Sequence, residues 1–187
     1  MIKNQEILKT IWRYYMQREQ MMQLSLNLMQ NTEAVYLTTV NTDGMPNTRA
    51  MLNLRNTGSY PDLENFFTEY NQKLITFFTT NTSSGKVAQI KLNPFVCAYY
   101  CIPKQFQGVM LGGKIDIVTK ENFKKKLWQT EWEIYYPKGA DDPDYAVLRL
   151  TPVVINLTPV VIKGWAQMNR FELNLATFYE SIKFGTD

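Results

Sequence analysis

Hydrophobic side chains recur at close to helical spacing through the N-terminal part of the chain. Few helix-breaking residues interrupt this pattern, which predicts one long or kinked helix over residues 1–30. Its methionines would suit an irregular ligand pocket, although packing against a sheet is their commoner use. The apolar positions are Ile7, Leu8, Ile11, Trp12, Tyr15, Met21, Met22, Leu26, Leu28 and Met29.

Shorter apolar runs after residue 30 predict strands, with brief helical patterns between them. The strands are expected at 34–40, 46–55, 73–80, 95–101, 108–118 and 147–157, and the helices at 84–92, 121–128 and 169–184. The aromatic-rich segment 61–68 is interpreted as an insertion whose side chains cap the sheet or cover a ligand. Gly112 and Gly113 indicate a β-bulge or the close approach of another backbone. The pattern therefore favours a mainly β protein of the α+β class.

The first two strands are predicted to form a hairpin. Asp43-Gly44 lies between them, and glycine accepts the positive φ that a tight turn requires. Successive side chains of a strand point to opposite faces, which groups Ala50 with Leu52 and Leu54, and Arg49 with Met51 and Asn53. Arg49 is thus directed to a defined face, the alternative being an ordinary solvent-exposed strand arginine.

A pattern typical of phosphate binding follows the third strand. The apolar run ending at Phe78 leads into Thr79-Thr80-Asn81-Thr82-Ser83-Ser84-Gly85-Lys86, and a helical segment comes next. Amides at a helix start carry partial positive charge, small hydroxylated residues allow close approach, and the lysine adds a full charge. The alternative is an ordinary N-cap beside a solvated lysine.

The composition restricts the possible chemistry. The chain has 187 residues, of which 45% are hydrophobic and 20% charged, as expected for one globular domain with a sizeable core. It contains no histidine, which excludes serine–histidine and cysteine–histidine hydrolases and histidine-based acid–base catalysis. Any catalysis would therefore depend on a bound organic cofactor.

The charge distribution argues against two classes of partner. A net charge of +3 is too mild for a dedicated nucleic-acid or membrane-surface protein, and no strand shows interleaved basic and aromatic residues. The cluster Lys124–Lys126 fits the solvated face of an amphipathic helix better than a phosphate patch. Asp141, Asp142 and Asp144 lack the spacing of a calcium loop, so no metal is expected.

The cysteines and aromatic residues allow limited conclusions. Cys97 and Cys101 lie on one predicted strand, about 13 Å apart, which is too far for a disulfide. With no recognisable signal peptide and no long apolar run, the cytoplasm is the expected compartment. Four aromatic residues could form a substrate-facing wall, although core positions are their commoner use: Trp132, Tyr135, Tyr136 and Trp165.

Taken together, these motifs resemble the pyridoxamine 5′-phosphate oxidase-like, FMN-binding split-barrel superfamily. The resemblance covers roughly residues 30 to 155 and rests on the hairpin with Arg49-Ala50-Met51-Leu52, the block from Thr79 to Lys86, and Asn93-Pro94 after the next helix. The run from Trp132 to Leu150, with its Asp-Asp-Pro-Asp segment, is similar to the general stress protein 26-like branch.

The resemblance implies a six-stranded antiparallel split barrel that forms a homodimer, with FMN in a cleft between subunits. It implies one domain over residues 1–187, with the barrel at 34–165 between the helices at 1–30 and 169–184. It also implies a set of cofactor contacts: Arg49 at the phosphate or ring edge, the backbone of Ala50, Met51 and Leu52 along the ring, Thr79 and Thr80 facing the cofactor, Ser84 and Lys86 on the phosphate, and Gln107 near the flavin, with Gly108 as the alternative.

One departure from the family pattern limits the function. The true pyridoxamine phosphate oxidases end in a motif with arginine and histidine that holds the substrate, whereas this chain has no histidine. Vitamin B6 oxidation is therefore not expected. The resemblance favours an FMN-dependent oxidoreductase with an unidentified small substrate or electron donor, the alternative being a non-catalytic flavin-binding stress or sensor protein.

Overall fold

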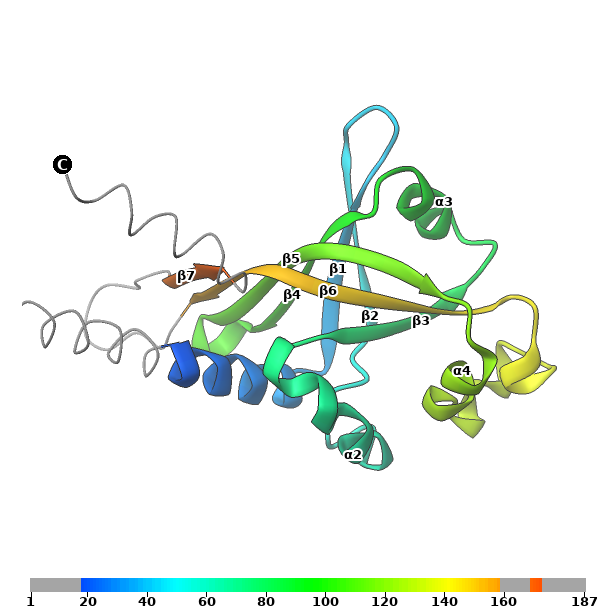
Figure 1. Cartoon of the computed structure of the whole chain (residues 1–187), viewed down its shortest axis with the longest axis horizontal. Coiled ribbons are helices and arrows are strands. Elements are labelled where there is room, and N and C mark those ends of the chain that lie inside the picture. The colour runs from blue at the N-terminus through cyan, green and yellow to red at the C-terminus, as the bar shows by residue number, and fades with distance from the viewer. Residues whose placement is uncertain (1–17, 159–168, 173–187) are drawn as a thin grey trace, which may run out of the picture.

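The computed structural model describes residues 18–158 and 169–172, and its core is one antiparallel sheet (Figure 1). Residues 18–31 form a helix that precedes the sheet. The strands are β1 (Ala34–Val40), β2 (Pro46–Leu52), β3 (Thr76–Asn81), β4 (Phe95–Ile102), β5 (Gln107–Val118), β6 (Tyr145–Thr158) and β7 (Asn169–Glu172). The further α-helices are α2 (Glu64–Phe67), α3 (Gly85–Leu92) and α4 (Glu121–Leu127). Short 3-10 turns are η1 (Pro61–Leu63), η2 (Thr68–Lys73), η3 (Pro103–Gln105), η4 (Thr130–Ile134) and η5 (Gly139–Asp141).

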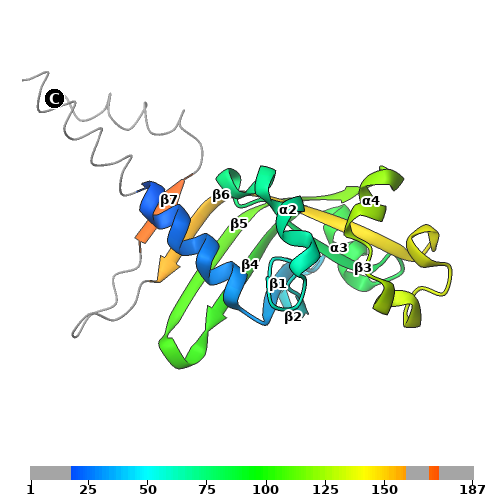
Figure 2. The same ribbon diagram turned by 90° about the horizontal axis from the view of Figure 1, so that it is seen from below.

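The strands follow the order β2-β1-β4-β5-β6-β3, and all of their pairings are antiparallel. The sheet curls so that its two edge strands, β2 and β3, approach each other. This arrangement is a split barrel, which confirms the predicted fold class. Figures 1 and 2 show α4 and the segment before β6 at one end of the molecule and β7 at the other.

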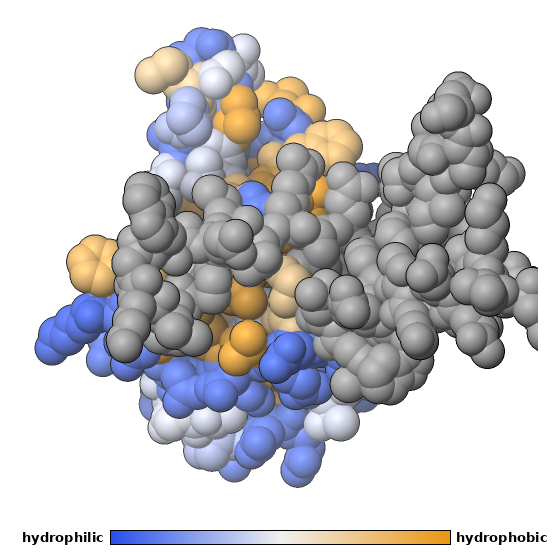
Figure 3. Space-filling view, turned by 90° about the vertical axis from the view of Figure 1, so that its left-hand side faces the viewer, coloured by the Kyte–Doolittle hydropathy of each residue, from blue (hydrophilic) through white to orange (hydrophobic). Residues whose placement is uncertain are grey.

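The predicted hairpin is present at β1 and β2. The Gly44 amide donates to the Asn41 carbonyl at 3.0 Å, and Gly44 has a φ of 82°. Figure 3 shows mainly hydrophilic side chains over the tip of this hairpin, at the top of the view. The alternation on β2 is also confirmed as far as Leu52. The predicted extension to residue 55 is wrong, because the chain turns at Asn53, and Leu54 is buried instead of sharing the exposed face of Leu52.

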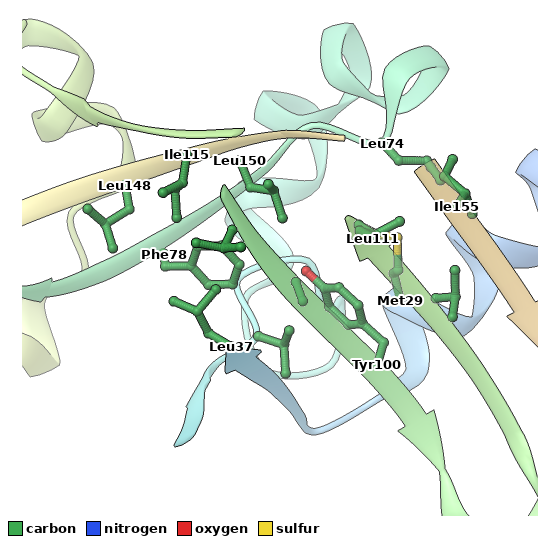
Figure 4. Close-up of a cluster of buried hydrophobic side chains, with 14 of the residues drawn as sticks. Met29, Leu37, Leu74, Phe78, Tyr100, Leu111, Ile115, Leu148, Leu150 and Ile155 are labelled. Atoms are coloured by element: carbon green, nitrogen blue, oxygen red, sulfur yellow. The ribbon is translucent and has the colours of Figure 1, made fainter. Parts of the chain in front are cut away.

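Two clusters of buried side chains stabilise the fold. The first fills the barrel and includes Leu37, Phe78 and Leu111, which converge in Figure 4. Within it the Tyr100 hydroxyl lies 2.8 Å from Thr76 Oγ1, so the two buried hydroxyls satisfy each other. Burial raises the pKa of Tyr100 to about 12.

The second cluster is mainly aromatic and lies on the opposite face of β3. Phe77 is its centre, and the rings of Phe66 and Phe123 pack against it at centroid distances of 5.5 and 5.1 Å. The segment 61–68 therefore packs on the face of β3 that points away from the barrel interior. Trp132 and Tyr136 are buried here, which assigns them a packing role, whereas Tyr135 is exposed and Trp165 lies outside the described residues.

The predicted bulge is confirmed where β5 meets β6. The pairing register shifts between Gly112 and Gly113, which lie opposite Val154 and Pro152. A Cβ at Gly113 would lie 2.2 Å from the Thr151 carbonyl oxygen, so only glycine fits this position. Pro152, which has no amide to donate, is tolerated in a central strand because the ladder is interrupted there.

The helix over residues 18–31 is fixed to the turn after β2 by a buried amide. Asn53 Nδ2 donates to the carbonyl oxygens of Met29 and Thr32, each at 2.7 Å, and Asn56 Nδ2 donates to the Thr32 carbonyl at 2.8 Å. These bonds satisfy carbonyls that the end of a helix leaves without partners. The predicted N-terminal helix is thus confirmed over 18–30, and residues 1–17 lie outside the described part of the chain.

Asn53→Ala is expected to lower the free energy of unfolding by about 2–3 kcal/mol, because it removes the buried hydrogen bonds that Asn53 donates to the Met29 and Thr32 carbonyls. Asn31→Ala is the matched control, since Asn31 is exposed and its side chain bonds only within its own helix, to Asn27. We expect that control to cost about 0.5 kcal/mol or less in urea denaturation. Equal losses for the two variants would contradict a locking role for Asn53.

The prediction for the C-terminal segment needs correction. Asn169–Glu172 forms β7, which pairs with β6 between Val154 and Leu157, and does not begin a helix. β3 pairs only with the first half of β6, up to Leu150, so the second half has an open edge that β7 occupies. An available sheet edge outweighs local helix propensity here. The rest of the predicted helix, 173–184, and barrel residues 159–165 lie outside the described residues.

Candidate functional site

The turn from β3 into α3 carries the predicted phosphate pattern. Ser84 precedes the helix in an extended conformation, with φ −69° and ψ 147°, but its hydroxyl makes no capping hydrogen bond. It lies instead 3.4 Å from Thr80 Oγ1. The first turn of α3 contains no acidic residue. Ser84 therefore occupies the N-cap position of α3, but its hydroxyl does not serve as the cap.

Lys86 turns back from α3 toward the end of β3. Its Nζ donates to Thr80 Oγ1 at 2.8 Å, so the lysine is held in place by the protein. Partial burial, followed by the charge of Arg49, lowers the pKa of Lys86. A lysine in this setting is not the freely solvated side chain of the alternative interpretation.

Arg49 lies half-buried between the hairpin and α3. Its guanidinium donates to Thr39 Oγ1 at 2.6 Å, to the Leu37 carbonyl at 3.3 Å and to Gln89 Oε1 at 3.2 Å. Gln89 Nε2 in turn donates to Asn41 Oδ1. Burial lowers the pKa of Arg49. The arginine is thus fixed in direction, in contrast to an exposed strand arginine.

Arg49 and Lys86 lie close enough for their charges to interact, and among the described residues neither has a carboxylate partner. In the part of the chain that the structure describes, the ion pairs join Lys125 to Asp141 at 2.8 Å and Arg149 to Asp116 at 3.4 Å, so neither includes Arg49 or Lys86. Like charges in a partly buried setting repel, and a bound anion would relieve that repulsion. The arrangement is therefore suited to binding an anionic group.

The structure brings together four of the residues expected from the sequence, namely Arg49, Thr80, Ser84 and Lys86. Thr79 follows the alternation of β3 and points to the face opposite Thr80. On β2, Ala50 and Leu52 face outward and are exposed, whereas Met51 packs against the first cluster.

Gln107 does not join this group within one chain. A row of paired residues crosses the sheet from Arg49 on β2 through Leu37 on β1 and Ala98 on β4 to Leu111 on β5. Gln107 lies four residues along β5 from that row, beside Ile102, or about 13 Å away along the strand. At neighbouring Gly108, a Cβ would meet the Tyr99 ring, so that position is covered by Tyr99.

Sequence reasoning missed three polar residues of the network, Thr39, Asn41 and Gln89. A signal existed for Gln89, which lies three residues after Lys86 and thus on the same face of α3. Thr39 shares a strand face with Leu37, and its buried hydroxyl would have suggested a polar partner. Asn41 gave no local signal, because its role depends on how the hairpin packs against α3.

Other candidate features have structural roles. Lys125 and Lys126 are exposed on α4 while Leu127 is buried, which confirms the amphipathic helix. The described residues contain no group of acidic, cysteine or histidine side chains arranged to hold a metal ion. Both cysteines lie on β4 as free thiols. Over the described ranges, no helix has the length and apolarity needed to cross a membrane.

Comparison with known proteins agrees with this architecture. A C. acetobutylicum protein related to general stress protein 26 of B. subtilis is 28% identical, with a TM-score of 0.62 over 83% of this chain and 96% of that one. General stress protein 26 from Bacillus anthracis shares 16% identity, with a TM-score of 0.60 over 82% and 98%. A NimC/NimA family protein from C. acetobutylicum shares 17%, with a TM-score of 0.53 over 80% and 92%.

The family assignment rests on a match to most of the chain. No curated protein shows significant similarity to it. The family model described as pyridoxamine 5′-phosphate oxidase like matches residues 20–154, which include the hairpin with Arg49 and the helix α3 with Lys86. The chain therefore belongs to the pyridoxamine 5′-phosphate oxidase-like family.

Proposed function

We propose that this protein binds FMN, with the flavin phosphate held by Arg49, Thr80, Ser84 and Lys86. The observation that carries the proposal is the pair of partly buried cations with adjacent hydroxyls and no carboxylate partner among the described residues. Phosphate oxygens accept hydrogen bonds from such groups, and cationic donors make the stronger bonds. The donor set therefore fits a phosphate monoester.

The remaining contacts of the proposal concern the flavin ring. The backbone of Ala50, Met51 and Leu52 would run along the isoalloxazine, whereas Thr79, which points away from Thr80, would face the cofactor only beyond the phosphate. Ala50 and Leu52 share the outer sheet face with Tyr36 and Tyr99, which are 40% and 39% exposed. This exposed apolar surface supports a homodimer that completes the cleft. Gln107 is distant from Arg49 and Lys86 of its own chain. It would therefore reach the proposed flavin only if it came from the second subunit of the dimer.

The chemistry of the proposed site is electron transfer. FMN, when bound, supplies the group that accepts and donates a hydride or electrons. Arg49, Thr80, Ser84 and Lys86 would orient the phosphate. The usual pKa values of these side-chain types lie far from neutral pH. We therefore propose an oxidoreductase acting on a small molecule, with a reduced nicotinamide as candidate donor. The two free thiols suit a reducing compartment, so we place the protein in the cytoplasm.

One observation favours a second function. The chain has no histidine, and among the described residues no carboxylate pairs with Arg49 or Lys86 and could act there as an acid or base. A protein that stores or senses flavin without turnover would need no such group. Saturable oxidation of a reduced nicotinamide by the flavin-loaded protein would support the oxidoreductase, and its absence would support the binding protein.

The first test is the visible absorption spectrum of the purified protein after addition of FMN and gel filtration. We expect the flavin bands to remain with the protein. Riboflavin, which lacks the phosphate, is the matched ligand and should be lost on the column to a greater extent. A colourless protein that fails to retain FMN would overturn the proposal.

A further inference from the structure

The segment before β6 is bound to the turn that forms the proposed phosphate site. Figure 1 shows the yellow segment before β6 beside the connection between β3 and α3. The Thr82 amide donates to the Asp144 carbonyl at 2.7 Å, and Thr82 Oγ1 donates to the Pro143 carbonyl at 3.2 Å. Two backbone carbonyls therefore fix Thr82, the residue that follows β3.

The Asp144 carboxylate accepts three further hydrogen bonds from the same turn. Asn81 Nδ2 donates to Oδ2 at 2.7 Å, the Ser83 amide donates to Oδ1 at 2.8 Å, and Ser83 Oγ donates to Oδ2 at 3.2 Å. The bonds from Asn81 and then from the Ser83 amide lower the pKa of Asp144, so the carboxylate is charged at neutral pH. Such bonds to a charged acceptor are the stronger kind.

Asp144 is itself held from the other side. Its amide donates to Asp142 Oδ1 at 2.9 Å, and Asp142 Oδ2 accepts the Lys138 amide at 3.2 Å. Asp142 is buried, and Tyr145, which follows Asp144, pairs with Asn81 at the start of β6. The carboxylate therefore meets the turn from a fixed position.

The donors of this region fall into two groups, one bound to Asp144 and the other directed toward Thr80. Asp144 occupies the side-chain amide of Asn81 and both donors of Ser83, whereas the hydroxyl of Ser84 and the ammonium of Lys86 lie on the side of Thr80. A turn whose donors are fixed before binding loses less entropy when a ligand arrives. Without the Asp144 carboxylate, Asn81 and Ser83 would lose their acceptor, and the turn would be held only by its backbone bonds and the Thr82 hydroxyl.

We propose that Asp144 is a positioning residue that holds the turn 81–84 in the shape required for phosphate binding, so that the preference for FMN over riboflavin depends on it. This inference rests on the proposed function. Asp144 does not contact the phosphate in this arrangement. Its effect is confined to the affinity that the phosphate contributes, which distinguishes it from a general contribution to folding.

The test compares FMN and riboflavin dissociation constants by quenching of flavin fluorescence. In Asp144→Ala we expect the FMN preference to fall roughly tenfold, with riboflavin affinity nearly unchanged, because small displacements of binding groups weaken oriented contacts. Asp144→Asn keeps one acceptor for the Ser83 amide and should give a smaller fall. The matched control is Asp141→Ala, which removes a charge from the same segment but pairs with Lys125; it should leave the preference unchanged.

Hydrogen exchange of the ligand-free protein provides an independent measurement. Exchange in a peptide covering residues 82–88 should be faster in Asp144→Ala than in the wild type and the control. An unchanged FMN preference or unchanged exchange in Asp144→Ala would overturn the inference while leaving FMN binding intact. A wild-type protein that does not prefer FMN to riboflavin would overturn the proposed function, and the inference with it. If Asp144→Ala does not fold, Asp144→Asn decides the question by the same criteria.

Discussion

Replacing both Arg49 and Lys86 by alanine is expected to lower FMN affinity by about a hundredfold or more. Hydrogen bonds to charged groups contribute about 1.5–3 kcal/mol each, and two such losses correspond to about 10²–10⁴ in the dissociation constant. The free energy of unfolding should change by about 1 kcal/mol, because removal of two mutually repelling cations offsets part of the hydrogen bonding lost at Thr39 and Thr80. Fluorescence titration with FMN and urea denaturation measure the two quantities.

Two controls separate a phosphate site from a general effect of charge. Lys91→Ala removes a cation from the exposed last turn of the same helix and should leave FMN affinity unchanged within about twofold. Riboflavin affinity should fall much less than FMN affinity in the double variant. If the double variant retains FMN like the wild type, Arg49 and Lys86 do not hold the phosphate.

Gly113→Ala is expected to be the most destabilising single methyl addition in the sheet, costing about 3 kcal/mol or more. The new Cβ would lie 2.2 Å from the Thr151 carbonyl oxygen and 2.8 Å from the Pro152 Cα, and these backbone atoms can move only if the β5–β6 ladder opens. The loss should appear as a lower midpoint in urea or thermal denaturation.

The adjacent glycine supplies the control for this prediction. At Gly112 the nearest atoms to an added Cβ are Met110 Sδ at 3.6 Å and Val154 Cβ at 3.8 Å, which are ordinary contacts. Gly112→Ala should therefore change stability by about 1 kcal/mol or less. A similar loss for both variants would show that the bulge, as described, does not determine the requirement for glycine.

Local signals were sufficient to predict much of the fold and part of the candidate site. Asp43-Gly44 predicted the hairpin because its turn depends on one glycine with positive φ. The hydroxyl-rich turn before Lys86 predicted an anion site because a helix start and a lysine act over a few residues. The strict alternation of β3 could also have separated Thr79 from Thr80, since a strand cannot direct both to one face.

The features that were missed depend on distant parts of the chain. Asn53 ends β2 because its amide finds the carbonyls of Met29 and Thr32, which no local pattern identifies. Asn169–Glu172 becomes a strand because β6 offers an open edge. The partnership of Arg49 with Gln89 likewise requires the hairpin to pack on α3. In each case the decisive contact joins segments whose relative placement the sequence pattern does not specify.

The strand order has a consequence for how the protein acquires its proposed site during folding. Arg49 lies on a hairpin whose strands are adjacent in sequence, so its bonds to Thr39 and to the Leu37 carbonyl can form early and locally. β3, which carries Thr80, finds its sheet partner only in β6, where Asn81 pairs with Tyr145. Closing so long a loop is entropically costly and slow. On the ribosome, the residues of the proposed phosphate site would therefore come together only after β6 has been synthesised, and the proposed ligand FMN would bind the folded protein without assisting the early steps of its folding.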